Sequence, residues 1–114
     1  MTRTRKITAT YQGVTGTRHS HREYTHAVFG YSLADTRAAY YEDYLAKNSL
    51  PEEVRTRFES YVGEARAKGD YWLSVSWHQG PANAAKGLVA AQKKGGKYGK
   101  TFARVVLVLV NPQE

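Results

Sequence analysis

The stretch Y-W-L-S-V-S-W-H, residues 71–78, together with V-V-L-V-L-V, residues 105–110, decides the fold class. The first segment predicts a strand whose side chains alternate between two faces, Tyr71, Leu73, Val75 and Trp77 on one and Trp72, Ser74, Ser76 and His78 on the other. The second segment is apolar on both faces, which predicts an interior strand over residues 102–110. A short helix from Pro81 separates them, and such a succession usually makes its two strands parallel.

Two further strands are expected nearer the N-terminus. Residues 6–12 alternate apolar and polar side chains, and residues 22–31 are rich in Tyr, Thr, Val and Phe. Glycines between them, Gly13 and Gly16, predict a turn, so we expect these two strands to form a hairpin.

Two helices are expected between the hairpin and residues 71–78. Residues 32–47 and 49–69 carry apolar side chains at helical spacing, and Ser32 and Ser49 are predicted to cap them. The predicted order is therefore β-β-α-α-β-α-β. It indicates an α+β fold, a two-layer sandwich with a mixed four-stranded sheet and helices mainly on one face.

That arrangement leaves one row of valine or leucine side chains from residues 105–110 without a cover. The N-terminal arm, a second subunit or a target protein would cover it, and we expect a homodimer through the sheet face. The chain is expected to be a single domain, 1–114, with a basic N-terminal arm (1–6) and a Gly/Lys-rich loop (93–100).

Composition favours a folded protein of the cytoplasm. The 114 residues include no cysteine, which excludes disulfides and thiolate metal sites. The longest apolar run is far below the about 18 residues of a membrane helix. The start, M-T-R-T-R-K-I, has no following apolar segment, so we expect neither a signal peptide nor a membrane partner.

Charge is divided unevenly along the chain, whose net charge is +7. Residues 1–31 hold five basic side chains against one acidic, residues 32–70 hold six against eight, and residues 71–114 hold six against one. Two basic ends thus flank an acidic middle. A basic surface attracts the phosphates of nucleic acids, or another polyanion, although a solvated surface is the simpler interpretation.

We expect the basic ends to meet in one surface that binds DNA or RNA. Glycine-spaced lysines around Tyr98 suit phosphate contacts beside a stacking ring. A second patch of rings and hydroxyls is expected where the Trp72 face meets Tyr24 and His26. The predicted nucleic-acid contacts are Arg3, Arg5, Arg18, His19, His21, Arg22, Lys93, Lys94, Lys97, Tyr98 and Lys100.

Three histidines lie in H-S-H-R-E-Y-T-H, residues 19–26. Residues two apart share a strand face, so His19 and His21 form a possible metal pair, but no third ligand has a diagnostic spacing. The pair, followed by Tyr40 and Tyr44, resembles the motifs of single-strand nicking enzymes of the replication-initiator and relaxase class. Ser20 stands where those enzymes have a bulky apolar residue. We therefore expect a polar rim, with no catalytic residue, metal or cofactor.

The run S-H-R-E-Y-T-H-A-V, residues 20–28, and W-H-Q-G-P-A-N-A-A-K, residues 77–86, resemble segments of small proteins of actinobacteria and their phages. That group has no established activity, so the resemblance implies only a phage or mobile-element origin. The sequence thus favours a non-enzymatic nucleic-acid-binding accessory protein. The alternative is an effector that binds and inhibits a host protein, and a metal-dependent nicking nuclease is a third reading.

Overall fold

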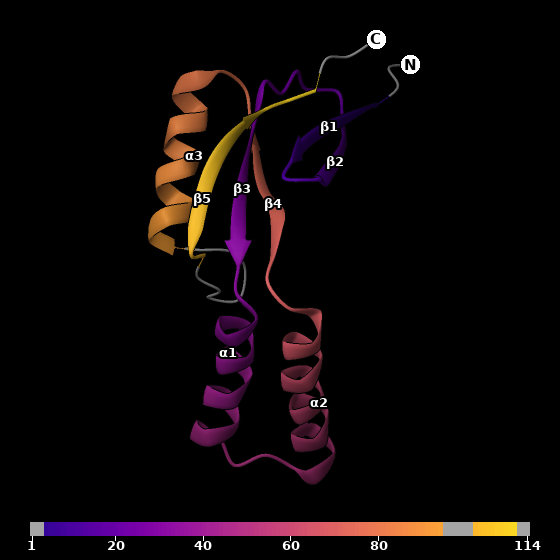
Figure 1. The fold of residues 1–114 in the computed structure, drawn as a ribbon, viewed down its shortest axis with the longest axis vertical. Helices are drawn as coiled ribbons and strands as arrows, with labels where there is room; N and C mark the ends of the chain where they lie inside the picture. Colours follow the sequence, from indigo (N-terminus) through magenta and orange to yellow (C-terminus); the bar gives the residue numbers. More distant parts are fainter. Residues whose placement is uncertain (1–3, 95–101, 112–114) are drawn as a thin grey trace.

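The computed structural model describes residues 4–94 and 102–111. Figure 1 shows a body of strands and one helix, from which two further helices extend together along the 51 Å axis of the molecule. The α+β class is therefore confirmed. In chain order the elements are β1 (Arg5–Tyr11), β2 (Val14–Ser20), β3 (His26–Ser32), α1 (Ala34–Lys47), α2 (Glu52–Lys68), β4 (Tyr71–His78), α3 (Pro81–Lys94) and β5 (Arg104–Leu109).

The strands form two small antiparallel sheets, so the prediction of one mixed four-stranded sheet is wrong. One sheet has three strands in the order β4-β3-β5, and the other is the β1–β2 hairpin. Both β4 and β5 run antiparallel to β3, so they are parallel to each other as predicted, but β3 lies between them. The expectation of an interior strand over 102–110 is also wrong, because β5 is an edge strand.

The β-hairpin joins β1 to β2, and not to residues 22–31 as predicted. Its turn is Gln12–Gly13, with φ angles of 51° and 75°, as in the tight turns that match the twist of paired strands. Gly16 belongs to β2 instead of the turn. A Cβ at Gly16 would lie 2.6 Å from the Cβ of Ser74, so this glycine allows β2 to pack directly on β4.

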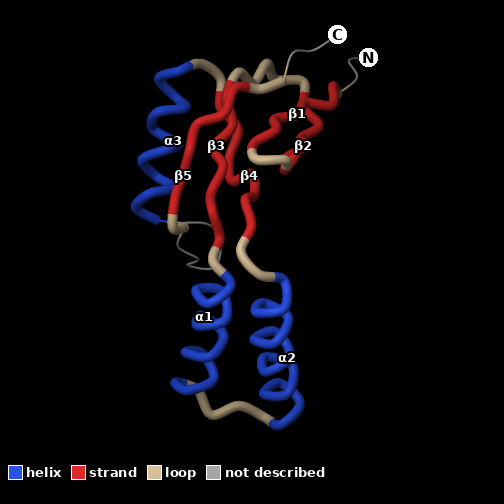
Figure 2. Tube along the Cα trace, viewed as in Figure 1, coloured by secondary structure: helices blue, strands red, loops and turns tan. Residues whose placement is uncertain are grey.

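Both faces of the three-stranded sheet are covered. The β-hairpin lies on one face, where Ala9, Ala27 and Phe29 form the buried core and Val106 and Val108 pack against it. Helix α3 packs on the other face (Figure 2). Cover by the β-hairpin on one face and by α3 on the other, and not an interior position, thus accounts for the half-buried Val105, Val106 and Val108, whereas Leu107 and Leu109 remain exposed. The face that was expected to form a homodimer is occupied by the β-hairpin.

A β-bulge changes which side chains of β4 share a face. The register with β3 shifts between Val28 and Phe29, so that Phe29 lies opposite Ser74 while Ala27 lies opposite Trp77. Because Ala27 and Phe29 are two apart in β3, their partners point to the same side. Trp77 therefore joins Ser74 on the β-hairpin side, whereas simple alternation placed it on the opposite face.

Helices α1 and α2 pack against each other and extend beyond the end of the sheet (Figure 1). The prediction that helices cover one face therefore holds for α3 alone. Aromatic rings line the contact between α1 and α2. The ring of Tyr44 stacks on that of Phe58 with centroids 4.8 Å apart, and the ring of Tyr41 lies 5.3 Å from that of Tyr61. Within the described residues, no helix is both long and apolar enough to cross a membrane.

Buried Arg37 fixes the α1–α2 hairpin to the end of the sheet. Its guanidinium donates hydrogen bonds to the carbonyl and hydroxyl of Ser32 at 3.0 and 2.8 Å, to the carbonyl of Ala65 at 3.1 Å and to that of Gly69. This use of Ser32 explains why it does not cap α1. The amide of Ala34 instead donates to the Asp70 carboxylate, 2.7 Å away. Helix α2 likewise begins after Pro51, without the predicted cap at Ser49.

Candidate functional site

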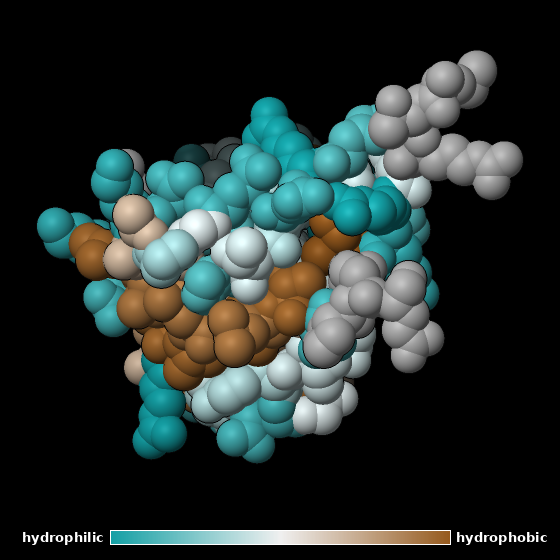
Figure 3. All heavy atoms as spheres, turned by 90° about the horizontal axis from the view of Figure 1, so that it is seen from above, coloured by the Kyte–Doolittle hydropathy of each residue, from teal (hydrophilic) through white to brown (hydrophobic). Residues whose placement is uncertain are grey.

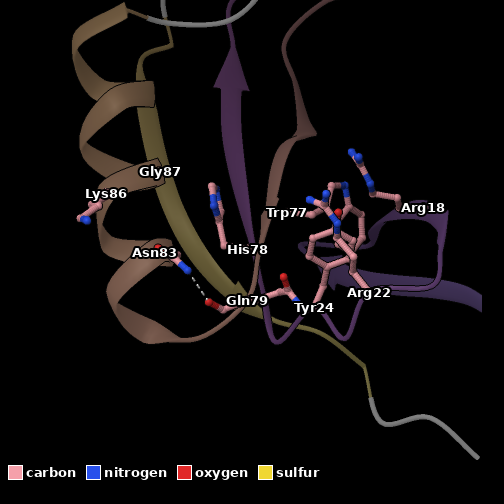
Figure 4. Close-up of a pocket in the computed structure, with 9 residues that line it drawn as sticks. All are labelled: Arg18, Arg22, Tyr24, Trp77, His78, Gln79, Asn83, Lys86 and Gly87. Carbon is pink, nitrogen blue, oxygen red and sulfur yellow. Dashed lines mark hydrogen bonds between the residues drawn. The ribbon is translucent and has the colours of Figure 1, made fainter.

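An open cleft of about 520 Å³ lies at the end of β4, between the β-hairpin and α3. Because β4 is an edge strand, the cleft passes around its free edge from one face of the sheet to the other. Figure 4 shows side chains from both sides of the sheet around this edge. The lining residues, none of them acidic in the described part of the chain, are Arg18, Arg22, Tyr24, Trp77, His78, Gln79, Asn83, Lys86 and Gly87.

One wall of the cleft is built by the end of β2 and the bend that follows it. Ser20 closes that bend, because its hydroxyl accepts a hydrogen bond from the amide of Arg22 at 3.1 Å. The Arg18 guanidinium lies over the ring of Tyr24, 5.4 Å from its centroid, and that ring lies 6.4 Å from the ring of Trp77. Two guanidinium groups and two aromatic rings thus gather on one side (Figure 4).

The positive charge of this wall changes the acidity of Tyr24. Desolvation raises the pKa of Tyr24, but the hydrogen bond with Ser20 and the charges of Arg18 and Arg22 together outweigh it, so the pKa lies below the usual 10.0. The wall therefore favours negative charge, even on a phenol. An anionic ligand group placed there would gain from the same field.

His78 lies between this wall and α3. Its Nε2 atom is 2.7 Å from the hydroxyl of Ser76, and a Cβ at Gly87 would lie only 2.1 Å from that nitrogen. Gly87 therefore allows the imidazole to lie against the helix. Desolvation, and then the neighbouring His26, lower the pKa of His78 below 6.5, so the ring is neutral at pH 7.

Thr25 holds the elements around the cleft in place. Its amide donates to the carbonyl of His78 at 3.0 Å, and its carbonyl accepts from the amide of Val110 at 3.0 Å. Its hydroxyl accepts from the amide of Gly80 at 2.8 Å, and it also lies 2.7 Å from Nδ1 of His26 and 3.5 Å from the carbonyl of His78. One side chain thus joins the start of β3 to the end of β4 and the start of α3.

The structure brings together part of the predicted nucleic-acid surface. Arg18 and Arg22 line the cleft, and Arg5 lies beside Arg22 in an adjoining hollow, paired with Glu23 at 3.7 Å. His19 is next to Arg18 in β2, so it points to the opposite, exposed face of the β-hairpin. His21 is exposed but is not among the lining residues.

The predicted lysines lie on or after α3. Lys93 is exposed and two helical turns beyond Lys86, so both lie on the same stripe of the helix, which leads away from the cleft. Lys94 ends α3, and its side chain lies outside the described residues. Arg3, Lys97, Tyr98 and Lys100 also fall outside them.

The predicted patch of rings on the Trp72 face is not an open surface. Trp72 packs between Tyr11, at 4.8 Å, and Tyr31, at 4.9 Å, beneath the β-hairpin. Instead, Trp77 reaches the cleft, because the bulge in β4 turns it toward the β-hairpin. The sequence interpretation also missed Lys86 and Asn83. Their only signal is a position shortly after the Gly80–Pro81 pair, within the first two turns of a helix.

The residues of the nicking-enzyme resemblance are not brought together. Tyr40 and Tyr44 lie on α1 and contact other rings of the α1–α2 hairpin, whereas His19 lies at the opposite end of the molecule in β2 (Figure 1). In the part of the chain that the structure describes, no three His, Cys, Asp or Glu side chains lie close enough to hold a metal ion. A metal-assisted attack by either tyrosine therefore has no geometric support.

The cleft is thus a cationic, ring-bearing groove with neutral imidazole and amide groups on its far side. Comparison with protein-family models, with curated proteins and with solved structures finds no match to this chain.

Proposed function

We propose that the protein binds single-stranded nucleic acid in the cleft at the edge of β4, without catalysing a reaction. The observation that carries this proposal is the cluster of Arg18, Arg22 and Tyr24, in which cations and a ring share one wall and none of the described lining residues is acidic. Phosphates are recognised by guanidinium groups, which donate two hydrogen bonds in a fixed geometry.

The shape of the cleft favours a single strand over a duplex. Its volume of about 520 Å³ fits a nucleotide, and it is an open groove around a strand edge instead of a flat basic face. Tyr24 and Trp77 are both partly exposed and offer ring surfaces beside the arginines. Bases that are free of a duplex stack on such rings, with about 1–3 kcal/mol for each base.

Separation of charge within the fold supports the same proposal. The acidic middle of the sequence forms the α1–α2 hairpin, which extends away from the body (Figure 1). Arg18, Arg22 and Lys86 instead line one groove. A polyanion that approaches the cleft therefore does not meet the acidic helices. Lys93 continues the cationic stripe along α3 for a longer strand.

The test is the salt dependence of binding to a fluorescent single-stranded oligonucleotide, measured by anisotropy. Each phosphate contact contributes about −0.7 to the slope of log K against log salt for a single strand. Replacing both guanidinium groups in R18Q/R22Q should therefore make the slope shallower by about 1.4 and weaken binding at low salt. A duplex of the same length should bind less tightly than the single strand.

The matched control is R55Q/R57Q, which removes the same charge from exposed positions of α2. It should retain the wild-type slope. The proposal fails if the wild-type protein has no affinity for single strands at low salt. It also fails if both double variants change the slope equally, because binding would then follow net charge and not the cleft.

The resemblance to actinobacterial and phage proteins supports an accessory role in a phage or mobile element. The alternative partner is a host protein with an acidic groove, which the same cationic wall would also attract. A pulldown with and without nuclease separates the two. Capture that survives nuclease treatment and is lost in R18Q/R22Q would favour the protein partner.

A further inference from the structure

Strand β5 pairs with β3 along one edge, and within the described residues its other edge is open from Val105 to Leu109. The open stretch ends at Asn111, whose amide donates to the carbonyl of Thr8 in β1 at 2.8 Å. The amide of Val110 donates to the carbonyl of Thr25, so alternation directs the backbone groups of Val106 and Val108 toward β3. The backbone N–H and C=O groups of Val105, Leu107 and Leu109 consequently point away from β3, in the plane of the sheet, toward the open edge. Such an edge is a template for pairing with another strand.

The side chains along this edge are apolar and exposed. Leu109 is 71% exposed and Leu107 is 39% exposed, and Val89 of α3 is 45% exposed. Val89 lies one turn before Gln92, which lines a hollow with Val105, so both face the β5 side of the helix. Figure 3 shows an uninterrupted apolar patch on the side of the body where β5 and α3 lie. No charged residue occurs from Val105 to Val110.

We propose that this edge binds a second copy of the chain, by antiparallel pairing of β5 with β5 about a two-fold axis at Leu107. In this register Leu107 lies opposite its symmetry mate, and Val105 lies opposite Leu109 of the second copy. All three positions present their backbone groups to the free edge, so every pair in the register exchanges hydrogen bonds. The two three-stranded sheets become one continuous sheet.

A second copy fits this edge for reasons of charge and shape. Like charges do not face each other across the axis, because Arg104 lies opposite Val110 of the other copy. Val105, Leu107 and Leu109 share the α3 face, so both sets of side chains form one apolar row, flanked by Val89 from each helix. The nucleic-acid cleft is at β4, the other edge of the sheet.

The dimer does not depend on the proposed ligand, and it gives that ligand two sites. Pairing through β5 leaves a cleft at each outer edge of the combined sheet. A strand long enough to reach both clefts would bind more tightly than a short one, through the higher effective concentration at the second site.

Cysteine cross-linking tests the register directly, because the chain has no cysteine of its own. Opposite residues of a hydrogen-bonded antiparallel pair have Cα atoms about 5.5 Å apart, within the range of a disulfide. L107C should therefore form a covalent dimer on oxidation. L109C is the matched control, because the two copies of this residue would be separated by four strand positions, about 13 Å.

Light scattering of nuclease-treated protein tests the association itself. The wild-type chain should have twice its 12.8 kDa mass, and the mass should persist in high salt, which dissociates nucleic-acid complexes. L107K/L109K should be monomeric with an unchanged circular dichroism spectrum, since both side chains are exposed in the monomer. T17K, at an exposed position of β2, should remain dimeric.

A monomeric wild-type mass up to the solubility limit would overturn the proposal. A dimer in which L109C cross-links as readily as L107C, or which L107K/L109K leaves intact, would place the interface elsewhere. Neither result would affect the salt-dependence test of the cleft.

Discussion

Replacement of Arg37 by methionine should show that one buried cation fixes the α1–α2 hairpin to the body. Arg37 is 4% exposed and donates hydrogen bonds to four acceptors, and its guanidinium also lies 4.4 Å from the centroid of the Tyr71 ring. Methionine retains the aliphatic stem but donates nothing. The carbonyls of Ser32, Ala65 and Gly69 would then lose their charged donor.

The expected loss of stability is large. A hydrogen bond to a charged group contributes about 1.5–3 kcal/mol, and a buried acceptor that loses its donor costs about 1–3 kcal/mol. Because R37M leaves several buried acceptors without their donor, we expect a loss of at least about 3 kcal/mol. A small domain has about 5–15 kcal/mol in total, so a substantial fraction would be removed.

The control is R66M, which removes an arginine from the same hairpin. Arg66 is 54% exposed and pairs with Glu42, which is 48% exposed, so its loss should cost about 0.2–1 kcal/mol. Urea unfolding followed by circular dichroism reports the helices, while fluorescence reports Trp72 and Trp77 in the body. R37M should shift the helical transition most. Equal free energies of unfolding for R37M and R66M would refute the reasoning.

Two further predictions concern close packing and pH. G16A should lower the melting temperature, because the added Cβ would overlap Ser74 and overpacking costs about 1–3 kcal/mol. G63A in helix α2 is the control. Nothing lies within 4 Å of its added Cβ, so the higher helix propensity of alanine should raise stability by about 0.5–1 kcal/mol. An unchanged G16A protein would contradict the packing of β2 on β4. Because desolvation and then His26 lower the folded pKa of His78 below 6.5, the unfolded chain binds this proton at higher pH than the folded chain. Stability from this group is therefore complete above pH 6.5 and is lost as the pH falls through the folded pKa. Urea titrations from pH 7.5 to 4.5 should show this loss, and H78Q should reduce it.

Local patterns along the chain predicted most of the elements. The strand over residues 71–78 has the predicted ends, and the helices follow the apolar stripes. The strand β2 was missed because V-T-G-T-R-H-S has one apolar side chain and a central glycine, which indicates a turn unless the close approach of Ser74 is known. Its pairing depends on contacts far apart in sequence, which no local pattern contains.

The arrangement of the sheet was harder to predict. An uninterrupted apolar run indicates that both faces of a strand are covered. It does not distinguish an interior strand from an edge strand that has another element packed on each face. The bulge in β4 is equally hidden, since it depends on the register with β3. Without it, Trp77 was assigned to the wrong face.

Two residues that line the candidate cleft were among the contacts predicted from the sequence. Arg18 and Arg22 were identified because they are cations in one short segment, and they do lie together. Lys86 joins them only through the three-dimensional packing of α3, so the sequence offered no reason to connect it with β2. His19 illustrates the converse, because neighbours in a strand point to opposite faces.

The α1–α2 hairpin leaves the body after Ser32 and returns at Tyr71, and these two residues lie opposite each other in the β3–β4 register. Because the chain leaves β3 and enters β4 at paired residues, a tight turn could connect the two strands in place of the helices. The α1–α2 hairpin is therefore an insertion between two paired strands. Its length or sequence can change, in evolution or by engineering, without altering the groove at the other end of the molecule.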